Sequence, residues 1–126
     1  MRGFRSIMAL YPHAHLVTAM PHPQLQEILA QLRQGLEALY GDRLLQLILY
    51  GSQARGDARD DSDIDVLIVL QEPVDPSAEI KRTSYLVADL CLQYNVVISC
   101  VFAPLNRIQT EQSPFFMNVR REGVQI

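Results

Sequence analysis

The sequence predicts an α/β or α+β fold in which one small mixed β-sheet is flanked by helices. Three observations lead to this prediction. Apolar residues recur at helical spacing in several stretches, aliphatic runs of strand length lie between them, and the two patterns alternate along the 126 residues. Because 48% of the residues are hydrophobic, the chain can bury a core as one compact unit.

The chain is expected to begin its ordered part with a long helix and a strand. An apolar stripe at helical spacing predicts a helix over 25–39, with Pro23 in its first turn and Gly41 as its C-cap. The aliphatic run 44–50 has the length of a strand. The stripe of the helix comprises Leu25, Ile28, Leu29, Leu32, Leu36 and Leu39.

A short helix and a second strand follow. Gly51 ends the first strand, and we expect Ser52 to cap a brief helix over 53–58. The run 64–70 is rich in β-branched residues and predicts another strand. Both of its faces are apolar beyond Asp65, so we expect this strand to be central in the sheet.

A second long helix is expected to begin at Pro76 or Ser77 and to extend to Tyr94. Its apolar positions are spaced to form one stripe, and we expect that stripe to pack in the core. The stripe comprises Ile80, Thr83, Val87, Leu90 and Tyr94.

The last predicted elements are a strand and a helix. The run 96–102 predicts a third strand, closed by Pro104. Ser113 is suited to an N-cap and Pro114 to the first helical position, and the helix that they begin should end at Gly123. The helix carries Phe115, Phe116 and Val119. We expect most of the cluster Phe115-Phe116-Met117 to pack in the core, and its exposed portions are candidates for an interface with a partner.

The composition excludes several classes of protein. Lysine and arginine total 11 against 14 acidic residues, a net charge of −3, so a broad electropositive face for duplex nucleic acid is not expected. No apolar run approaches the ~20 residues that a membrane helix needs. Cys91 and Cys100 both have apolar neighbours, which indicates free thiols in a reducing, cytoplasmic environment.

The domain is expected to comprise residues 20–126. Pro12 and the histidines around it interrupt the first apolar patch, and no small-residue cleavage site follows, so a signal peptide is not predicted. Residues 1–19 are therefore expected to form a flexible N-terminal extension, unless Met20 is the true start. His13, His15 and His22 are interpreted as surface residues rather than as a metal site.

Acidic residues gather between the strands 44–50 and 64–70, in the stretch LILYGSQARGDARDDSDIDVLIVL. Strand side chains alternate between faces, so Asp63 and Asp65 should project to the same side with Cα atoms about 6.6 Å apart. Two carboxylates so placed repel each other unless a cation lies between them. Hard oxygen ligands suit Mg²⁺ or Mn²⁺, and Mg²⁺ usually takes one or two carboxylates plus phosphate oxygens.

Gly51 and Ser52 offer the complementary half of a site. They lie where a strand ends and a short helix begins, so backbone N–H groups and a hydroxyl are available to an anion, and glycine permits its close approach. A cation clamp and an anion cradle together predict a metal–polyphosphate ligand such as a nucleoside triphosphate. The alternative is a purely structural role, in which the acidic run is a polar turn and Gly-Ser is an ordinary turn pair.

Three other ligand motifs fail on inspection. The glycines 51 and 56 have P-loop spacing, but Asp57 and Ala58 stand where Lys and Ser or Thr are required. A dinucleotide fingerprint would need a third glycine. An EF-hand counted from Asp61 has Val66 at the position that requires glycine.

The charged stretch resembles a family signature. Gly51-Ser52, ten intervening residues and then Asp63-Ile64-Asp65 are similar to the Gly-Ser-x10-Asp-x-Asp motif of minimal nucleotidyltransferases in the DNA polymerase β superfamily. The order of helices and strands from about Leu25 to Gly123 also fits that family, and residues 1–19 fall outside it. The resemblance implies a nucleotidyltransferase, polymerase β-like fold.

The resemblance implies transfer of a nucleoside monophosphate, with pyrophosphate as the leaving group. Asp63 and Asp65 would be the catalytic, metal-binding residues, and Gly51 and Ser52 would hold the triphosphate of ATP with Mg²⁺ or Mn²⁺. Arg55 would either contact phosphate or brace the loop. The superfamily usually has a third carboxylate on a neighbouring strand, whereas the candidate strand, residues 95–102, contains no acid.

Small members of the family resemble antitoxins whose partner is a HEPN-type toxin, and the implied reaction is adenylylation of a tyrosine on that partner. Two hypotheses follow. The protein is either an enzyme that transfers AMP to its toxin within a hetero-oligomer, or a catalytically weak antitoxin that neutralises the toxin by binding alone. The intact motif favours the first, and the missing third acid favours the second. Nucleotide preference is not predicted.

Overall fold

The computed structural model describes residues 23–59 and 61–126. The expected N-terminal extension and the three histidines lie outside the described residues. In chain order the elements are α2 (Leu25–Tyr40), the 3-10 turn η2 (Gly41–Arg43), β1 (Leu44–Tyr50), α3 (Ser52–Arg55), β2 (Ile64–Leu70), α4 (Pro76–Tyr94), β3 (Ile98–Pro104), α5 (Leu105–Thr110), α6 (Pro114–Glu122) and β4 (Val124–Gln125). No helix in the described part is long and apolar enough to span a membrane.

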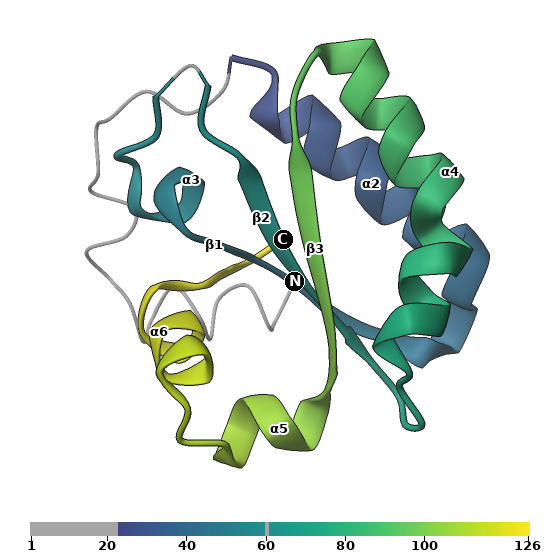
Figure 1. Cartoon of the computed structure of the whole chain (residues 1–126), viewed down its shortest axis with the longest axis vertical. Coiled ribbons are helices and arrows are strands. Elements are labelled where there is room, and N and C mark those ends of the chain that lie inside the picture. The colour runs from purple at the N-terminus through teal and green to yellow at the C-terminus, as the bar shows by residue number, and fades with distance from the viewer. Residues whose placement is uncertain (1–22, 60) are drawn as a thin grey trace.

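The sheet is mixed and has the strand order β3-β2-β1-β4 (Figure 1). β1 and β2 pair antiparallel, β1 pairs antiparallel with β4, and β2 pairs parallel with β3. The parallel pair is joined by α4, as a crossover between parallel strands requires. β2 is an inner strand, and residues 66–70 in it are buried, so its predicted central place is confirmed.

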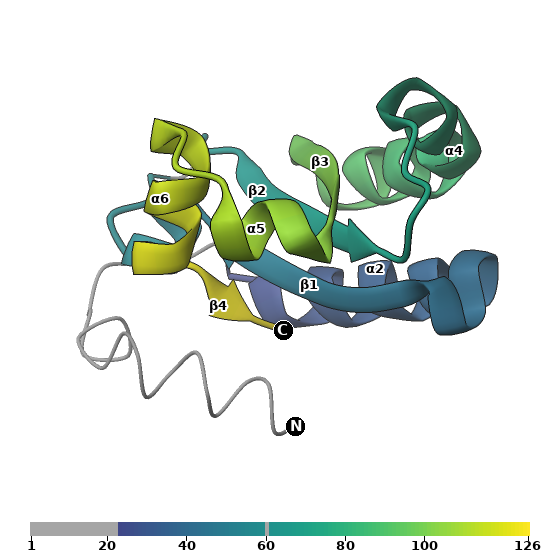
Figure 2. The same cartoon turned by 90° about the horizontal axis from the view of Figure 1, so that it is seen from below.

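Helices cover both faces of the sheet, which confirms the predicted fold class. α2 and α4 lie side by side over one face (Figures 1 and 2), and their apolar stripes enclose one core with the even-numbered residues of β2. α5 and α6 lie over the other face, where Phe116 and Val119 pack with Leu67 and Val69. Since Asp65 precedes Leu67 by two residues, its side chain is on the α6 face.

The bounds of β1 and β2 confirm the two predicted strands, and α6 begins with the predicted cap. The Ser113 hydroxyl oxygen accepts a hydrogen bond from the Phe116 N–H. β3 begins two residues later than predicted, at Ile98, and includes Pro104. Neither α5 nor β4 was predicted, because each is too short to show a period in the sequence.

Two predictions about the core helices were wrong. Leu39 is 45% exposed, because Tyr40 lies one turn beyond Leu36 and takes the inward position instead. Ile80 is 56% exposed, because the neighbouring carboxylate Glu79 faces the core in the first turn of α4. Periodicity identified both helices but placed their last and first core residues one position off.

The prediction that Ser52 caps a helix over 53–58 was also wrong. α3 ends at Arg55, and Gly51 is its N-cap. The Gly51 carbonyl oxygen accepts hydrogen bonds from the N–H groups of Ala54 and Arg55. The left-handed backbone of Gly56, with φ +81°, then ends the helix after four residues.

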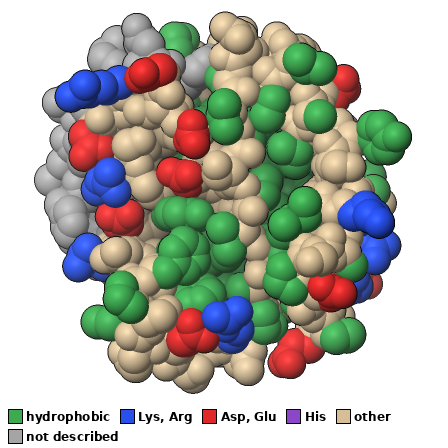
Figure 3. Space-filling model, in the orientation of Figure 1, with side chains coloured by type: hydrophobic (Ala, Val, Ile, Leu, Met, Phe, Trp, Pro, Cys, Tyr) green, Lys and Arg blue, Asp and Glu red, His purple; other side chains and the backbone are tan. Residues whose placement is uncertain are grey.

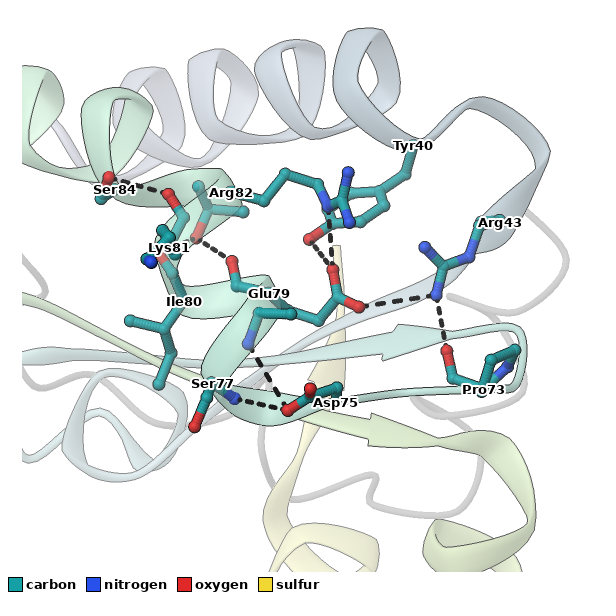
Figure 4. Close-up of polar contacts among 12 residues, drawn as sticks. Tyr40, Arg43, Pro73, Asp75, Ser77, Glu79, Ile80, Lys81, Arg82 and Ser84 are labelled. Atoms are coloured by element: carbon teal, nitrogen blue, oxygen red, sulfur yellow. Dashed lines mark hydrogen bonds and ion pairs between the residues drawn. The ribbon is translucent and has the colours of Figure 1, made fainter.

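Glu79 joins α4 to the end of α2 (Figure 4). Its side chain is buried, and Oε1 accepts hydrogen bonds from the Tyr40 hydroxyl at 2.8 Å and from Arg82 Nε at 3.2 Å. Arg43 lies 3.6 Å from its other oxygen and also donates to the Pro73 carbonyl. This network lies at the start of β1, the end of the strand remote from Gly51.

Candidate functional site

The antiparallel pairing of β1 and β2 brings the two halves of the predicted site together. The end of β1 lies beside the start of β2, and Tyr50 is directly opposite Asp65. Gly51 follows immediately, with φ +74°. A Cβ atom built on Gly51 would lie only 2.3 Å from Asp65 Oδ2. The Asp65 carboxylate therefore occupies the space that any other residue at position 51 would need.

Asp63 and Asp65 form an electrostatically strained pair. Asp63 is exposed just before β2, whereas Asp65 is partly buried within it. Burial raises the pKa of the Asp65 carboxyl, the negative charge of Asp63 raises it further, and the Arg55 guanidinium opposes the rise. The raised pKa shows that the ionised form of Asp65 is disfavoured in this site.

Tyr50 lies on the same face and borders the acidic pair. Its ring makes an edge-on contact with Phe115, with the centroids 5.3 Å apart. Burial raises the pKa of Tyr50 to about 12, and the charge of Asp65 contributes to the rise. The hydroxyl thus stays protonated at neutral pH, and the ring packs against Phe115.

An apolar area adjoins the acidic residues. Tyr50, Val101, Leu105 and Phe115 pack against the core of this face but remain partly exposed. Figure 3 shows hydrophobic side chains gathered in the middle of this face, with acidic side chains above them. A ligand that contacts Asp65 can therefore also contact apolar surface.

Arg55 projects from α3, and acidic side chains hold it. Its Nε lies 3.2 Å from Asp57 Oδ2, and its Nη1 lies 3.2 Å from Glu122 Oε1. The arginine side chain is 46% exposed. Of the two roles considered for Arg55, these contacts match bracing of the loop, while the exposure leaves the guanidinium open to an anion.

Glu122 is the site residue that the sequence analysis missed. It lies at the end of α6, and its Oε1 accepts hydrogen bonds from the Gly51 N–H at 3.3 Å and from Arg55. Its charge also contributes to the raised pKa of Asp65. Spacing and periodicity do not separate a lone glutamate at a helix end from a solvated surface residue. The one signal in the sequence is that the C-terminal stretch VRREGVQI, which contains Glu122, resembles the ending of small members of the family, and no site role was assigned to it.

A third carboxylate does not complete a metal cluster in the described part of the chain. Across 23–59 and 61–126, no group of three or more His, Cys, Asp or Glu side chains is placed to hold an ion. The β3 residue opposite Asp65 is Ser99. Asp63 and Asp65 nevertheless fit Mg²⁺, because this ion usually takes one or two carboxylates and completes its shell with water and substrate phosphate.

Comparison with known proteins gives a family match and related proteins. The model of the nucleotidyltransferase domain family matches residues 29–120, well over half of the chain. "Putative protein adenylyltransferase MJ0141" from Methanocaldococcus jannaschii is 31% identical over 104 residues, which are 82% of this chain and 99% of the relative. "Putative protein adenylyltransferase MJ0604" from the same organism is 35% identical over 103 residues, which are 78% of this chain and 93% of the relative.

A solved structure shares the fold. The crystal structure of "a putative nucleotidyltransferase from Sulfolobus solfataricus" has a TM-score of 0.51 and 17% sequence identity, and the match covers 80% of this chain and 74% of that chain. At this identity the likeness concerns the arrangement of helices and strands alone.

Proposed function

The chain belongs to the nucleotidyltransferase domain family, and from this premise we propose that it transfers AMP from ATP to a hydroxyl group of a partner protein. We further propose that this partner is a HEPN-type toxin and that the protein acts as its antitoxin. The observation that carries the proposal is the contact between the Gly51 turn and the Asp65 carboxylate, with Asp63 beside it.

Each residue of this junction has a role in the proposed reaction. Gly51 and Ser52 form the turn against which the triphosphate rests, because only a residue without a side chain leaves room for both phosphate and Asp65. Asp63 and Asp65 would hold Mg²⁺, which would neutralise phosphate charge and polarise the α-phosphate. Arg55 is exposed on the same side and adds a positive charge for the phosphates.

In the proposed reaction the protein forms no covalent bond with the substrates. The oxygen of the acceptor hydroxyl attacks the α-phosphorus and its proton passes to solvent. The bond between the α-phosphorus and the oxygen that bridges to the β-phosphate breaks, and pyrophosphate leaves with that electron pair. The chain's contribution is to fix the reactants in line and to balance charge. The apolar area formed by Tyr50, Val101, Leu105 and Phe115 would support the protein segment that presents the hydroxyl.

A protein acceptor is supported by two observations. The two relatives that match this chain along almost their full length each carry the name "Putative protein adenylyltransferase". The partly exposed aromatic surface next to Asp65 also suits a tyrosine side chain better than a charged or sugar acceptor.

A second candidate function is neutralisation of the toxin by binding alone. The observation that favours it is the lack of a three-carboxylate group among residues 23–59 and 61–126, with Ser99 rather than an acid opposite Asp65. A site of this kind would bind nucleotide without efficient activation of the acceptor.

One experiment separates the two functions. The protein is incubated with Mg²⁺, labelled ATP and the protein encoded by the neighbouring gene. Transfer is supported if label appears on the neighbouring protein with the wild type and does not appear with the double variant Asp63→Asn plus Asp65→Asn. A stable complex that carries no label supports binding alone. If neither label nor a complex is observed, the HEPN-type partner is rejected.

A further inference from the structure

We propose that Glu122 is a positioning residue that holds the Gly51 turn and Arg55 in the arrangement that receives the nucleotide. This inference rests on the proposed function and extends it to a residue outside the Gly-Ser-x10-Asp-x-Asp motif. It assigns to the C-terminal helix α6 a part in nucleotide binding.

The contacts of Glu122 are made to the two groups that the proposed site needs. A single oxygen, Oε1, accepts from the backbone N–H of Gly51 and from the side chain of Arg55. One carboxylate thus ties together the backbone of Gly51 and the charged side chain of Arg55. Without it, Arg55 would keep Asp57 as its described acidic partner and would be drawn toward the exposed loop.

Glu122 is itself held rigidly. Gly123 follows it so close to β1 that a Cβ atom there would lie 2.7 Å from the Cγ2 atom of Ile48. Beyond Gly123 the chain pairs with β1 as β4, with Val124 opposite Leu49. On its other side α6 is fixed by Phe116 and Val119 in the core. The carboxylate is therefore attached to a short segment that is anchored to β1 on both sides.

The charge of Glu122 argues against a direct phosphate contact. Glu122 is a third negative group near Asp65, so it would repel a triphosphate if it were close to the phosphate oxygens. Its side chain is 17% exposed, and its oxygen already accepts from two donors. Support of the turn from behind explains both the partial burial and the two contacts.

The position of Glu122 predicts an effect on nucleotide binding rather than on the chemical step. In Glu122→Ala, the Gly51 N–H and Arg55 lose their shared acceptor, and the turn gains freedom that the nucleotide must then remove. We expect the KM for ATP to rise about tenfold, the usual range for a supporting partner behind a site, with a smaller change in kcat. Glu122→Gln keeps an oxygen acceptor but loses the charge, so its KM should lie between wild type and Glu122→Ala.

The test combines kinetics with a structural readout. KM, kcat and direct ATP binding are measured for wild type, Glu122→Ala and Glu122→Gln, and hydrogen exchange of the Gly51 amide is followed by NMR in the same proteins. Glu111→Gln is the matched control, since Glu111 pairs with Arg107 near the opposite end of α6. The expected result is a raised KM and faster Gly51 exchange in the Glu122 variants only.

The possible contradictions are distinguishable. Unchanged KM and unchanged Gly51 exchange in an active protein overturn the role of Glu122 and leave the proposed function intact. A lowered KM also overturns it, because the carboxylate would then compete with phosphate. Absence of ATP binding and transfer in the wild type, with Gly51 exchange still faster in Glu122→Ala, contradicts the proposed function and confines Glu122 to structural support.

Discussion

Glu79 and Asp65 are two carboxylates that lie near opposite ends of β1 and are shielded from solvent to different degrees. Hydrogen-bond donors surround Glu79, whereas Asp65 lies beside a second carboxylate. Glu79 is 3% exposed, yet the hydrogen bonds from Tyr40 and Arg82 and the charge of Arg43 outweigh the effect of burial and lower its pKa. Asp65 has Asp63 as a neighbour, and burial together with that negative charge raises its pKa.

This difference distinguishes a carboxylate that stabilises the fold from one that belongs to the candidate site. A buried carboxylate with a full set of donors stabilises the fold in its ionised form. The ionised form of Asp65 is disfavoured despite the charge of Arg55, and a bound cation would stabilise that form. The Glu79 network is therefore complete without a ligand, whereas a bound cation would relieve the repulsion between Asp63 and Asp65.

The largest effect should come from the acidic pair. In Asp63→Asn plus Asp65→Asn, transfer of label to the acceptor should fall about a thousandfold, since a bound cation supplies several kcal/mol of transition-state stabilisation. The rate is measured with labelled ATP, and circular dichroism checks the fold. Asp89→Asn, an exposed position on α4, should keep the wild-type rate. Equal losses in both proteins would contradict the assignment of the site.

Glu79 should show the opposite behaviour. Glu79→Gln should lower the free energy of unfolding by about 2–3 kcal/mol, because Tyr40 and two arginines lose a charged acceptor, while the transfer rate stays near wild type. Urea unfolding gives the difference. Glu37→Gln, which breaks an exposed pair with Arg33, should cost less than about 1 kcal/mol. A similar cost at both positions would mean that the buried network adds nothing.

Gly51→Ala tests the contact that joins the two halves of the site. The left-handed backbone and the clash with Asp65 should lower stability by about 1–3 kcal/mol, and transfer should fall because Asp65 is displaced. Gly41→Ala is the matched control, since Gly41 also has a positive φ but a Cβ there meets nothing within 4 Å. Gly41→Ala should retain activity, and parallel losses of activity would argue against the Asp65 contact.

Asp65→Asn alone should stabilise the protein by about 0.5–1 kcal/mol while it removes activity, the exchange of stability against function that active sites often show. The amide carries no charge, so the repulsion by Asp63 and the cost of burying a carboxylate both disappear. Thermal unfolding at neutral pH without divalent cations measures the gain. A lower melting temperature than wild type would show that Asp65 is not strained.

The smallest effect is the pH dependence of the stability changes that Glu79→Gln and Asp65→Asn cause. The folded pKa of Glu79 is lowered, so its stabilisation is present above its unfolded pKa and is lost as the pH falls through the folded value. The folded pKa of Asp65 is raised, so its ionisation costs stability above that value, and the cost disappears as the pH falls. On acidification, the deficit of Glu79→Gln and the gain of Asp65→Asn should both shrink, and urea unfolding between neutral and acidic pH checks this.

Local patterns predicted the elements that position the site. β1 and β2 are apolar runs bounded by turn residues, and their predicted bounds agree with the structure. Hydrophobic periodicity was less informative where a polar residue faces the core and its apolar neighbour faces solvent. Glu79 takes an inward position next to Ile80 because donors from α2, η2 and α4 converge on it, and no spacing within α4 indicates those donors.

The sequence by itself determined the alternation of helices and strands and the spacing between the Gly-Ser pair and the two aspartates, because these depend on neighbours along the chain. Only the tertiary structure decided that Asp65 fills the space above Gly51 and that Glu122 reaches the same turn. Glu122 is 67 and 71 residues from its two partners. A contact over that separation depends on how α6 and β4 pack on β1, and such packing leaves no local period in the sequence.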